Sequence, residues 1–190
     1  MLAALLAALL LLLLAGRARG YGVGFAKLFE DAPGEVADAR LAVDGHLPAW
    51  LEGTLARNGP GQFNFGKRQA TVAFDGFAKL HRFRISGGQV VYSSRFLRSD
   101  SFNRTAKIQG DLAPMKTFGA LDPCLSIFGK AQGLFAMNDN MLVNVVKVGE
   151  SYLALSDAVG ALEFDLDSLG TLGAPPGIPQ GGGFPSVDGA

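Results

Sequence analysis

The 190-residue sequence is poor in the residue types that most often build a metal or redox site. It has one cysteine, Cys124, and two histidines, His46 and His81. One cysteine excludes an intrachain disulfide, and two histidines far apart in the sequence give no zinc-type spacing. Neither a phosphate-binding loop nor a nucleophile-elbow motif occurs. From motifs alone we therefore assign no catalytic, cofactor-binding or metal-ligating residue.

An excess of charge of either sign is also missing. Lysine plus arginine and aspartate plus glutamate number 17 each, so the formal net charge is zero. A nucleic-acid-binding protein needs a basic surface to meet the phosphates, and this composition offers no argument for one. Glycine, in contrast, is abundant at 26 residues, which indicates many tight turns.

The N-terminus carries an unbroken run of leucine and alanine over residues 2–15, which are 14 residues without a polar group. As a helix the run would reach about 21 Å, short of the roughly 30 Å hydrocarbon core of a bilayer. Its length and the small residues that follow predict a secretory signal peptide or hydrophobic leader over residues 1–20, hence a secretory or membrane-associated protein. An uncleaved anchor, a plastid-type leader and an artefact of gene prediction are the alternatives.

Short strands are expected through most of the remaining chain. Apolar and polar residues alternate, or apolar ones predominate, in five stretches: 78–85, 89–98, 142–148, 151–156 and 161–165. Glycine-bearing turns separate them, which favours antiparallel meanders, the unit of a propeller blade and equally of a sandwich. In residues 142–148 the two polar positions do not share a face, so we expect a strand packed on both sides. Residues 45–61 read as turn, short strand, turn, and residues 173–190 are too rich in glycine and proline for regular structure.

His81 and Asn103 are the two positions with a specific alternative reading. Alternation places His81 on the face of Lys79 and Phe83, where a structural histidine in a half-buried strand is favoured over a metal ligand. Asn103 begins an Asn-Arg-Thr sequon, a possible glycosylation site if the chain enters the secretory route.

Six stretches, taken in order, resemble the carotenoid-cleavage oxygenase family, and two of them, residues 122–124 and 140–150, are similar to its animal-type branch. The first, residues 47–61, contains Trp50 and the Arg-Asn-Gly-Pro-Gly run and is similar to the family's opening motif. The others follow in the family's order at residues 74–83, 95–100, 122–124, 140–150 and 164–169. The resemblance covers about residues 25–172 and identifies the chain as the N-terminal part of such an oxygenase.

That resemblance implies an all-β fold, the N-terminal portion of a seven-bladed β-propeller with a cap of loops and short helices, over residues 21–172. It also implies Fe(II), held in the full-length protein by four histidines that are beyond this chain, because His46 and His81 match non-ligand positions. The iron would use dioxygen to cleave a double bond of a carotenoid or apocarotenoid. The alternatives are a catalytically inactive fragment or binding protein of the same family and, more distantly, a secreted β-sandwich.

Segment 122–135 is expected to make a peripheral membrane contact. The family's polyene substrates are nearly insoluble in water, so a mouth resting on a bilayer would spare them a passage through water. On a helix the apolar positions of the segment would gather on one side, with Lys130 in reach of headgroups. The expected docking residues are Cys124, Ile127, Phe128 and Phe135.

Overall fold

The computed structural model describes residues 25–65, 68–70, 72–107, 139–157 and 160–177. The chain divides into two compact units, Met1–Glu30 and Asp31–Ala190. The described part of the first unit is a short 3-10 helix, η1 (Phe25–Phe29). All other elements belong to the second unit, and none of the described helices is long and apolar enough to cross a membrane.

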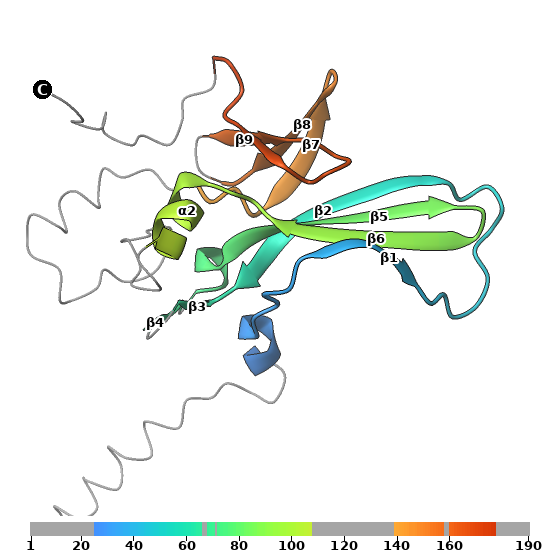
Figure 1. Cartoon of the computed structure of the whole chain (residues 1–190), viewed down its shortest axis with the longest axis horizontal. Coiled ribbons are helices and arrows are strands. Elements are labelled where there is room, and N and C mark those ends of the chain that lie inside the picture. The colour runs from blue at the N-terminus through green and yellow to red at the C-terminus, as the bar shows by residue number, and fades with distance from the viewer. Residues whose placement is uncertain (1–24, 66–67, 71, 108–138, 158–159, 178–190) are drawn as a thin grey trace, which may run out of the picture. The chain divides into compact units, whose positions relative to one another are not determined.

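The first sheet of the second unit, here called the N-terminal sheet, is four-stranded and antiparallel (Figure 1). Its strand order is β1-β6-β5-β2, and its strands are β1 (Val36–Leu41), β2 (Gly53–Gln62), β5 (Phe77–Ser86) and β6 (Gln89–Phe96). The β5–β6 hairpin turns through Gly87 and Gly88, whose φ angles are 56° and 73°. Glycine adopts this left-handed conformation at no steric cost, which suits a tight turn between twisted strands.

The second sheet, here called the C-terminal sheet, is an antiparallel meander of order β10-β9-β8-β7. Its strands are β7 (Asn144–Val148), β8 (Ser151–Leu155), β9 (Ala161–Phe164) and β10 (Thr171–Gly173). Four consecutive strands that pair up and down make the unit from which propeller blades are built.

Smaller elements complete the described chain. They are the two-stranded ribbon of β3 (Asn64–Phe65) and β4 (Arg68–Gln69), the 3-10 turn η2 (Ala73–Asp75) and the helix α2 (Asp100–Lys107). The helix was not anticipated from the sequence, because residues 100–107 have no apolar stripe long enough to suggest one. Phe102 packs from α2 against Phe77 and Phe96, so tertiary contact stabilises this short polar helix.

One apolar core lies between the two sheets. It consists of Ala78, Leu80, Leu97, Met141, Leu142, Ala154, Phe164 and Leu169, each less than 5 % exposed. Burying a large apolar side chain of this kind contributes about 1.5–3 kcal/mol. The buried amide of Asn140 adds a polar tie to this core, since it accepts from the Ala78 N–H at 2.8 Å and donates to the Gly76 carbonyl at 2.7 Å.

A buried arginine crosses from one sheet to the other. Arg82 on β5 is 2 % exposed and donates from Nη1 to the carbonyls of Leu166 (at 3.0 Å) and Asp167 in the turn between β9 and β10. From Nη2 it donates to Asp38 Oδ1 at 2.8 Å and to Ser93 Oγ at 2.9 Å. The guanidinium therefore binds the neighbouring strand β6, the next strand β1 and the last turn of the C-terminal sheet.

The five expected strands are all present as β5 to β9, within two residues at each end. Two expectations about strands are wrong. Residues 53–62 form one ten-residue strand rather than a short one, because Pro60 lies on an edge strand just before a bulge, and Gly61 leaves the room that Lys79 and Phe96 fill. β7 is not packed on both sides among the described residues: it is an edge strand, and Val148 is 61 % exposed.

The Arg82 clamp gives a stability prediction. Arg82→Met keeps an apolar stem of similar length but leaves two turn carbonyls without their charged donor and Asp38 with Arg84 as its remaining arginine. We expect a loss of about 3 kcal/mol in the free energy of unfolding, measured by urea denaturation, because the hydrogen bonds from a buried guanidinium to two carbonyls and to Ser93 are removed. Arg40→Met, an exposed arginine of the same sheet, is the matched control and should change little. Equal midpoints for the two variants would contradict the clamp.

Candidate functional site

The two histidines expected to be structural lie in different settings. His46 is exposed in the connection between β1 and β2. His81 lies in the middle of β5, where Nδ1 is 2.7 Å from the Tyr92 hydroxyl and the two rings stack at 6.0 Å between centroids. The register puts Lys79, His81 and Phe83 on one face of β5, as the alternation predicts. One ring nitrogen of His81, Nδ1, is thus hydrogen-bonded to Tyr92.

A shallow hollow of about 220 Å³ lies beside His81 and is lined by Arg57, Asn58, Gly59, His81 and Phe83. Burial lowers the pKa of His81 below its usual value, and the positive charges of Lys79 and Arg57 lower it further. The lowered pKa favours the neutral imidazole, which has one ring nitrogen that donates and one that accepts.

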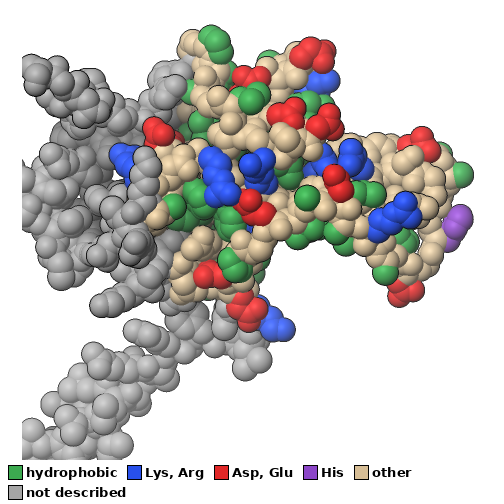
Figure 2. All heavy atoms as spheres, in the orientation of Figure 1, with side chains coloured by type: hydrophobic (Ala, Val, Ile, Leu, Met, Phe, Trp, Pro, Cys, Tyr) green, Lys and Arg blue, Asp and Glu red, His purple; other side chains and the backbone are tan. Residues whose placement is uncertain are grey.

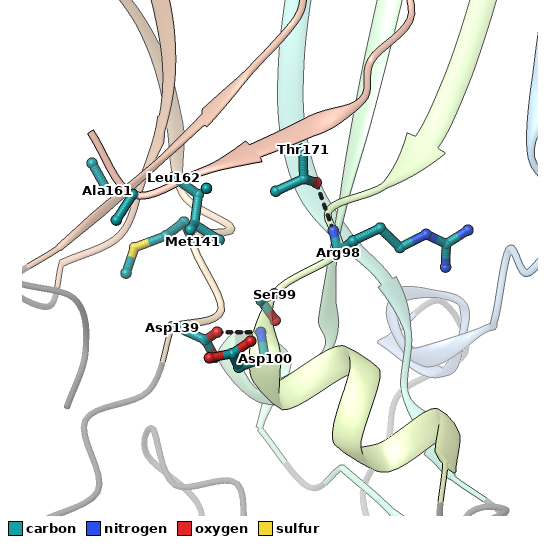
Figure 3. A pocket seen from close by; sticks show the side chains of 10 residues that line it. Arg98, Ser99, Asp100, Asp139, Met141, Ala161, Leu162 and Thr171 are labelled. Carbon is teal, nitrogen blue, oxygen red and sulfur yellow. Dashed lines mark hydrogen bonds between the residues drawn. The ribbon is translucent and has the colours of Figure 1, made fainter. Parts of the chain in front are cut away.

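A second hollow, of about 100 Å³, lies at the start of α2 (Figure 3). Asp139 there accepts hydrogen bonds from the Asp100 N–H and, at 3.1 Å, from the Ser101 N–H, while Thr171 Oγ1 accepts from the Arg98 N–H at 2.8 Å. A carboxylate at a helix N-terminus satisfies N–H groups that have no partner inside the helix. These polar groups are occupied in capping, so the hollow is structural and presents no nucleophile with a base.

A third hollow, of about 280 Å³, lies against the Arg82 clamp and is lined by residues of β1, β6 and the turn before β10. In that turn Asp165 accepts from the N–H and the hydroxyl of Ser168, both at 2.6 Å, and these bonds lower the pKa of Asp165. The turn falls in the stretch 164–169 that carries the family resemblance, and the bonds between Asp165 and Ser168 close it.

The described residues do not fit an iron site. No group of three or more histidine, cysteine, aspartate or glutamate side chains is arranged to hold a metal ion anywhere in that part of the chain. His46 and His81 sit in separate surroundings, and the one nitrogen of His81 with a partner is bonded to Tyr92. The described residues therefore supply no ligand set for the expected iron, and no step of the expected double-bond cleavage is assigned to them.

The other predicted positions have mixed outcomes. Cys124, Ile127, Phe128 and Phe135, as well as the leader over residues 1–20, lie outside the described residues. Asn103 is exposed on α2 and donates from Nδ2 to the Arg98 carbonyl at 3.2 Å, whereas Thr105 of the same sequon is 4 % exposed. Glycosylation of Asn103, the docking segment and the domain boundaries at residues 20 and 172 stay predictions.

Charged side chains of both signs are interspersed over the face of the molecule seen in Figure 2. The described ion pairs, such as Arg98 with Glu35 and Arg84 with Asp38, each at 2.7 Å, distribute the charge in the same way. The view shows no extended patch of one sign that would attract a polyanion.

The depressed pKa of His81 makes stability depend on pH. In the unfolded chain its pKa is close to the ordinary value of about 6.5, so as pH falls through that value the unfolded chain takes up a proton that the folded chain does not. Stability is therefore highest above about pH 7 and falls from there toward the lower folded-state pKa. We expect the urea midpoint to drop between about pH 7.5 and pH 5.5 and His81→Phe to flatten this slope. His46→Gln, at an exposed position, is the control, and an unchanged slope in His81→Phe would refute the assignment.

Comparison with known proteins identifies the family to which this chain is similar. A family model described as retinal pigment epithelial membrane protein matches residues 29–177. Human β,β-carotene 15,15'-dioxygenase is 38 % identical over 146 residues, which are 73 % of this chain and 26 % of that enzyme. The mitochondrial carotenoid-cleaving dioxygenase of Pongo abelii is 37 % identical over 148 residues, 74 % of this chain and 26 % of that protein. The chain thus spans about a quarter of the length of the curated relatives it matches.

Solved structures agree with the sequence relatives. A variant of Synechocystis apocarotenoid oxygenase superposes with a TM-score of 0.70 at 22 % identity, over 83 % of this chain and 33 % of that one. The cobalt-substituted form of the same oxygenase gives 0.69 at 22 % identity, over 82 % of this chain and 33 % of that one. This likeness confirms the expected all-β fold, a portion of a β-propeller. Because the family model covers most of the sequence, the chain belongs to the carotenoid-cleavage oxygenase family, the family of the retinal pigment epithelial membrane protein.

Proposed function

We propose that the chain is the N-terminal part of a non-haem iron oxygenase that cleaves a double bond of a carotenoid or apocarotenoid with dioxygen. The observation that carries the proposal is the 38 % identity to human β,β-carotene 15,15'-dioxygenase across 146 residues. In such a cleavage the two oxygen atoms of dioxygen end in two carbonyl groups, one on each product. Iron, when held by histidines outside this chain, would supply the dioxygen chemistry.

The part this chain plays in that proposal is architectural. Its two sheets are held at a defined angle by the core around Leu80 and by the Arg82 clamp, so each sheet can serve as one blade of the propeller. An enzyme whose ligands come from several blades depends on such fixed angles, because metal–ligand distances tolerate only small errors.

A second candidate is a binding protein or inactive product of the same family without iron. The absence of any three-ligand group among the described residues favours it for the 190-residue chain taken alone. The two candidates predict different iron content and different activity when this chain replaces the matching segment of a full-length relative.

A graft separates them. Residues 29–177 replace the matched segment of human β,β-carotene 15,15'-dioxygenase, and iron content, oxygen uptake and products from β-carotene are measured. We expect about one iron per chain and cleavage in the graft, and less than about 0.1 iron per chain in the 190-residue chain, which lacks a ligand set. A folded graft with iron but no cleavage would contradict the oxygenase role. Stoichiometric iron in the 190-residue chain would overturn the assignment of both histidines.

We also propose membrane contact through residues 122–135, with the leader over residues 1–20 as a separate targeting element. The triple change Ile127→Ser, Phe128→Ser and Phe135→Ser in the graft should weaken binding to phosphatidylcholine–phosphatidylserine vesicles about tenfold or more, since three apolar side chains are lost from the interface. Val148→Ser, at an exposed apolar position on β7, is the control.

Because the graft begins at residue 29, the leader is absent from this measurement. Binding unchanged by the triple change would sink the docking proposal. Vesicle binding seen only in a form that carries residues 1–20 would assign membrane contact to the leader instead.

A further inference from the structure

Residues 31–35, which we call the strap, are bonded to one end of β2, β5 and β6 by polar contacts. Asp31 Oδ1 accepts from the Phe63 N–H at 2.6 Å, just after β2. The Ala32 N–H donates to the Gly61 carbonyl at 2.8 Å. Most of the strap is exposed to water. Hydrogen bonds and charges therefore fix its position, and apolar burial contributes little.

The strap also binds two cations of the N-terminal sheet. Lys79 on β5 is 3 % exposed and donates from Nζ to the carbonyls of Ala32 and Gly34. Arg98, which follows β6, donates from Nη2 to Glu35 Oε1 at 2.7 Å. Burial lowers the pKa of Lys79, and the negative charge of Glu35 opposes that shift. Glu35 therefore acts on both cations, directly on Arg98 and at longer range on Lys79.

The same two cations lie over aromatic rings that lead to α2. Lys79 Nζ is 5.0 Å from the ring centroid of Phe96, and the guanidinium carbon of Arg98 is 4.7 Å from that of Phe102. The two rings stack on each other with their centroids 5.4 Å apart. Glu35 Oε1 also accepts from the Phe96 N–H at 2.9 Å. Cation–π and aromatic contacts have preferred geometries, so the position of one member restricts the next.

We propose that the strap positions helix α2, so that displacing the strap loosens the helix and loosening the helix frees the strap. Glu35 acts on Phe102 through Arg98. Lys79 acts on the same ring through Phe96. A helix of eight residues depends on tertiary contact, and Phe102 makes that contact for α2. Because the strap is exposed and partly ionic, salt or a competing charge weakens its hold on the helix.

Asp139 provides the alternative, in which its cap alone fixes α2 and the strap has no influence. It accepts from the Asp100 and Ser101 N–H groups at the start of the helix. Figure 3 shows the Arg98 side chain directed away from Asp139, so the strap and the cap hold the start of α2 from different directions. The cap satisfies backbone N–H groups but does not contact the ring of Phe102.

Amide hydrogen exchange in the 190-residue chain, read residue by residue by NMR, separates the two possibilities. Glu35→Gln removes the ionic bond to Arg98 and keeps a side chain of the same size. We expect the amides of residues 103–107 to exchange about threefold faster, as suits the loss of an exposed ion pair. Glu150→Gln, which removes the exposed pair with Lys147 in the C-terminal sheet, is the matched control and should leave α2 unchanged. Unchanged exchange of α2 in Glu35→Gln would assign the helix to its cap.

The route through Lys79 has its own variant. Lys79→Met keeps the apolar stem that fills the space over Gly61 but removes the ammonium that binds the strap. We expect the Ala32 N–H and the amides of α2 to exchange about threefold faster or more. Lys147→Met, at another lysine that lies over an aromatic ring, is the control and should change neither. Faster exchange of the strap alone would remove Lys79 from the proposal.

The coupling must also be measurable from the helix, because a free energy of coupling is reciprocal. Phe102→Leu should speed exchange of the Ala32 N–H about threefold, through contacts that do not join the two residues directly. Amides of β8 are the reference. An effect confined to α2 would overturn the proposal, and equal acceleration in β8 would show a global loss of stability instead.

Salt tests the ionic part without any change in packing. Raising it from about 0.05 M to about 0.5 M screens exposed charges, so exchange in α2 should rise about twofold more in the unaltered chain than in Glu35→Gln. An equal response of the two proteins would contradict a role for the Glu35–Arg98 pair.

Discussion

The two sheets depend on one buried guanidinium. Arg82 is nearly inaccessible to water, yet it satisfies two carbonyls of the turn before β10 together with Asp38 and Ser93 on its own side. A buried charge is tolerated only when its donors are bonded, so the turn and the N-terminal sheet must meet in one arrangement. The apolar core around Leu80 stabilises the contact between the two sheets but does not fix their orientation. The directional hydrogen bonds of Arg82 do.

The same clamp explains a local irregularity of the backbone. Asp38 has a φ of 48°, rare for a residue other than glycine, at the point where β1 bulges against β6. That conformation lets its Oδ1 accept from Arg82 and from Arg84 at 2.8 and 2.7 Å. A strained backbone conformation persists where contacts of the side chain stabilise it. Here Arg82 and Arg84 both donate to the Asp38 carboxylate.

Much of the strand pattern could be predicted, because β5, β6, β8 and β9 are stretches in which alternation or an apolar run is local and unbroken. The extent of β2 could not be, since its glycines and Pro60 look like turn signals until Lys79 and Phe96 are seen to fill the space over Gly61. Helix α2 could not be predicted for a related reason, because the residue that caps it, Asp139, is 39 residues away from Asp100 in the sequence. In the site, the position of His81 in a half-buried strand could be predicted, while its bond to Tyr92 depends on strand register.

The two faces of the N-terminal sheet divide the forces of folding in an unusual way. The face buried against the C-terminal sheet contains the charged Arg82, whereas the face left open carries Leu55, Phe83 and Tyr92 around an unpaired arginine. If folding of this chain alone had shaped the sheet, the apolar side chains would be expected inside and the charges outside. The buried charge is explained by the turn it binds, because both terminal nitrogens of Arg82 donate hydrogen bonds. Arg57, on the other face, is exposed, so water solvates its charge, whereas the buried charge of Arg82 depends on its protein partners.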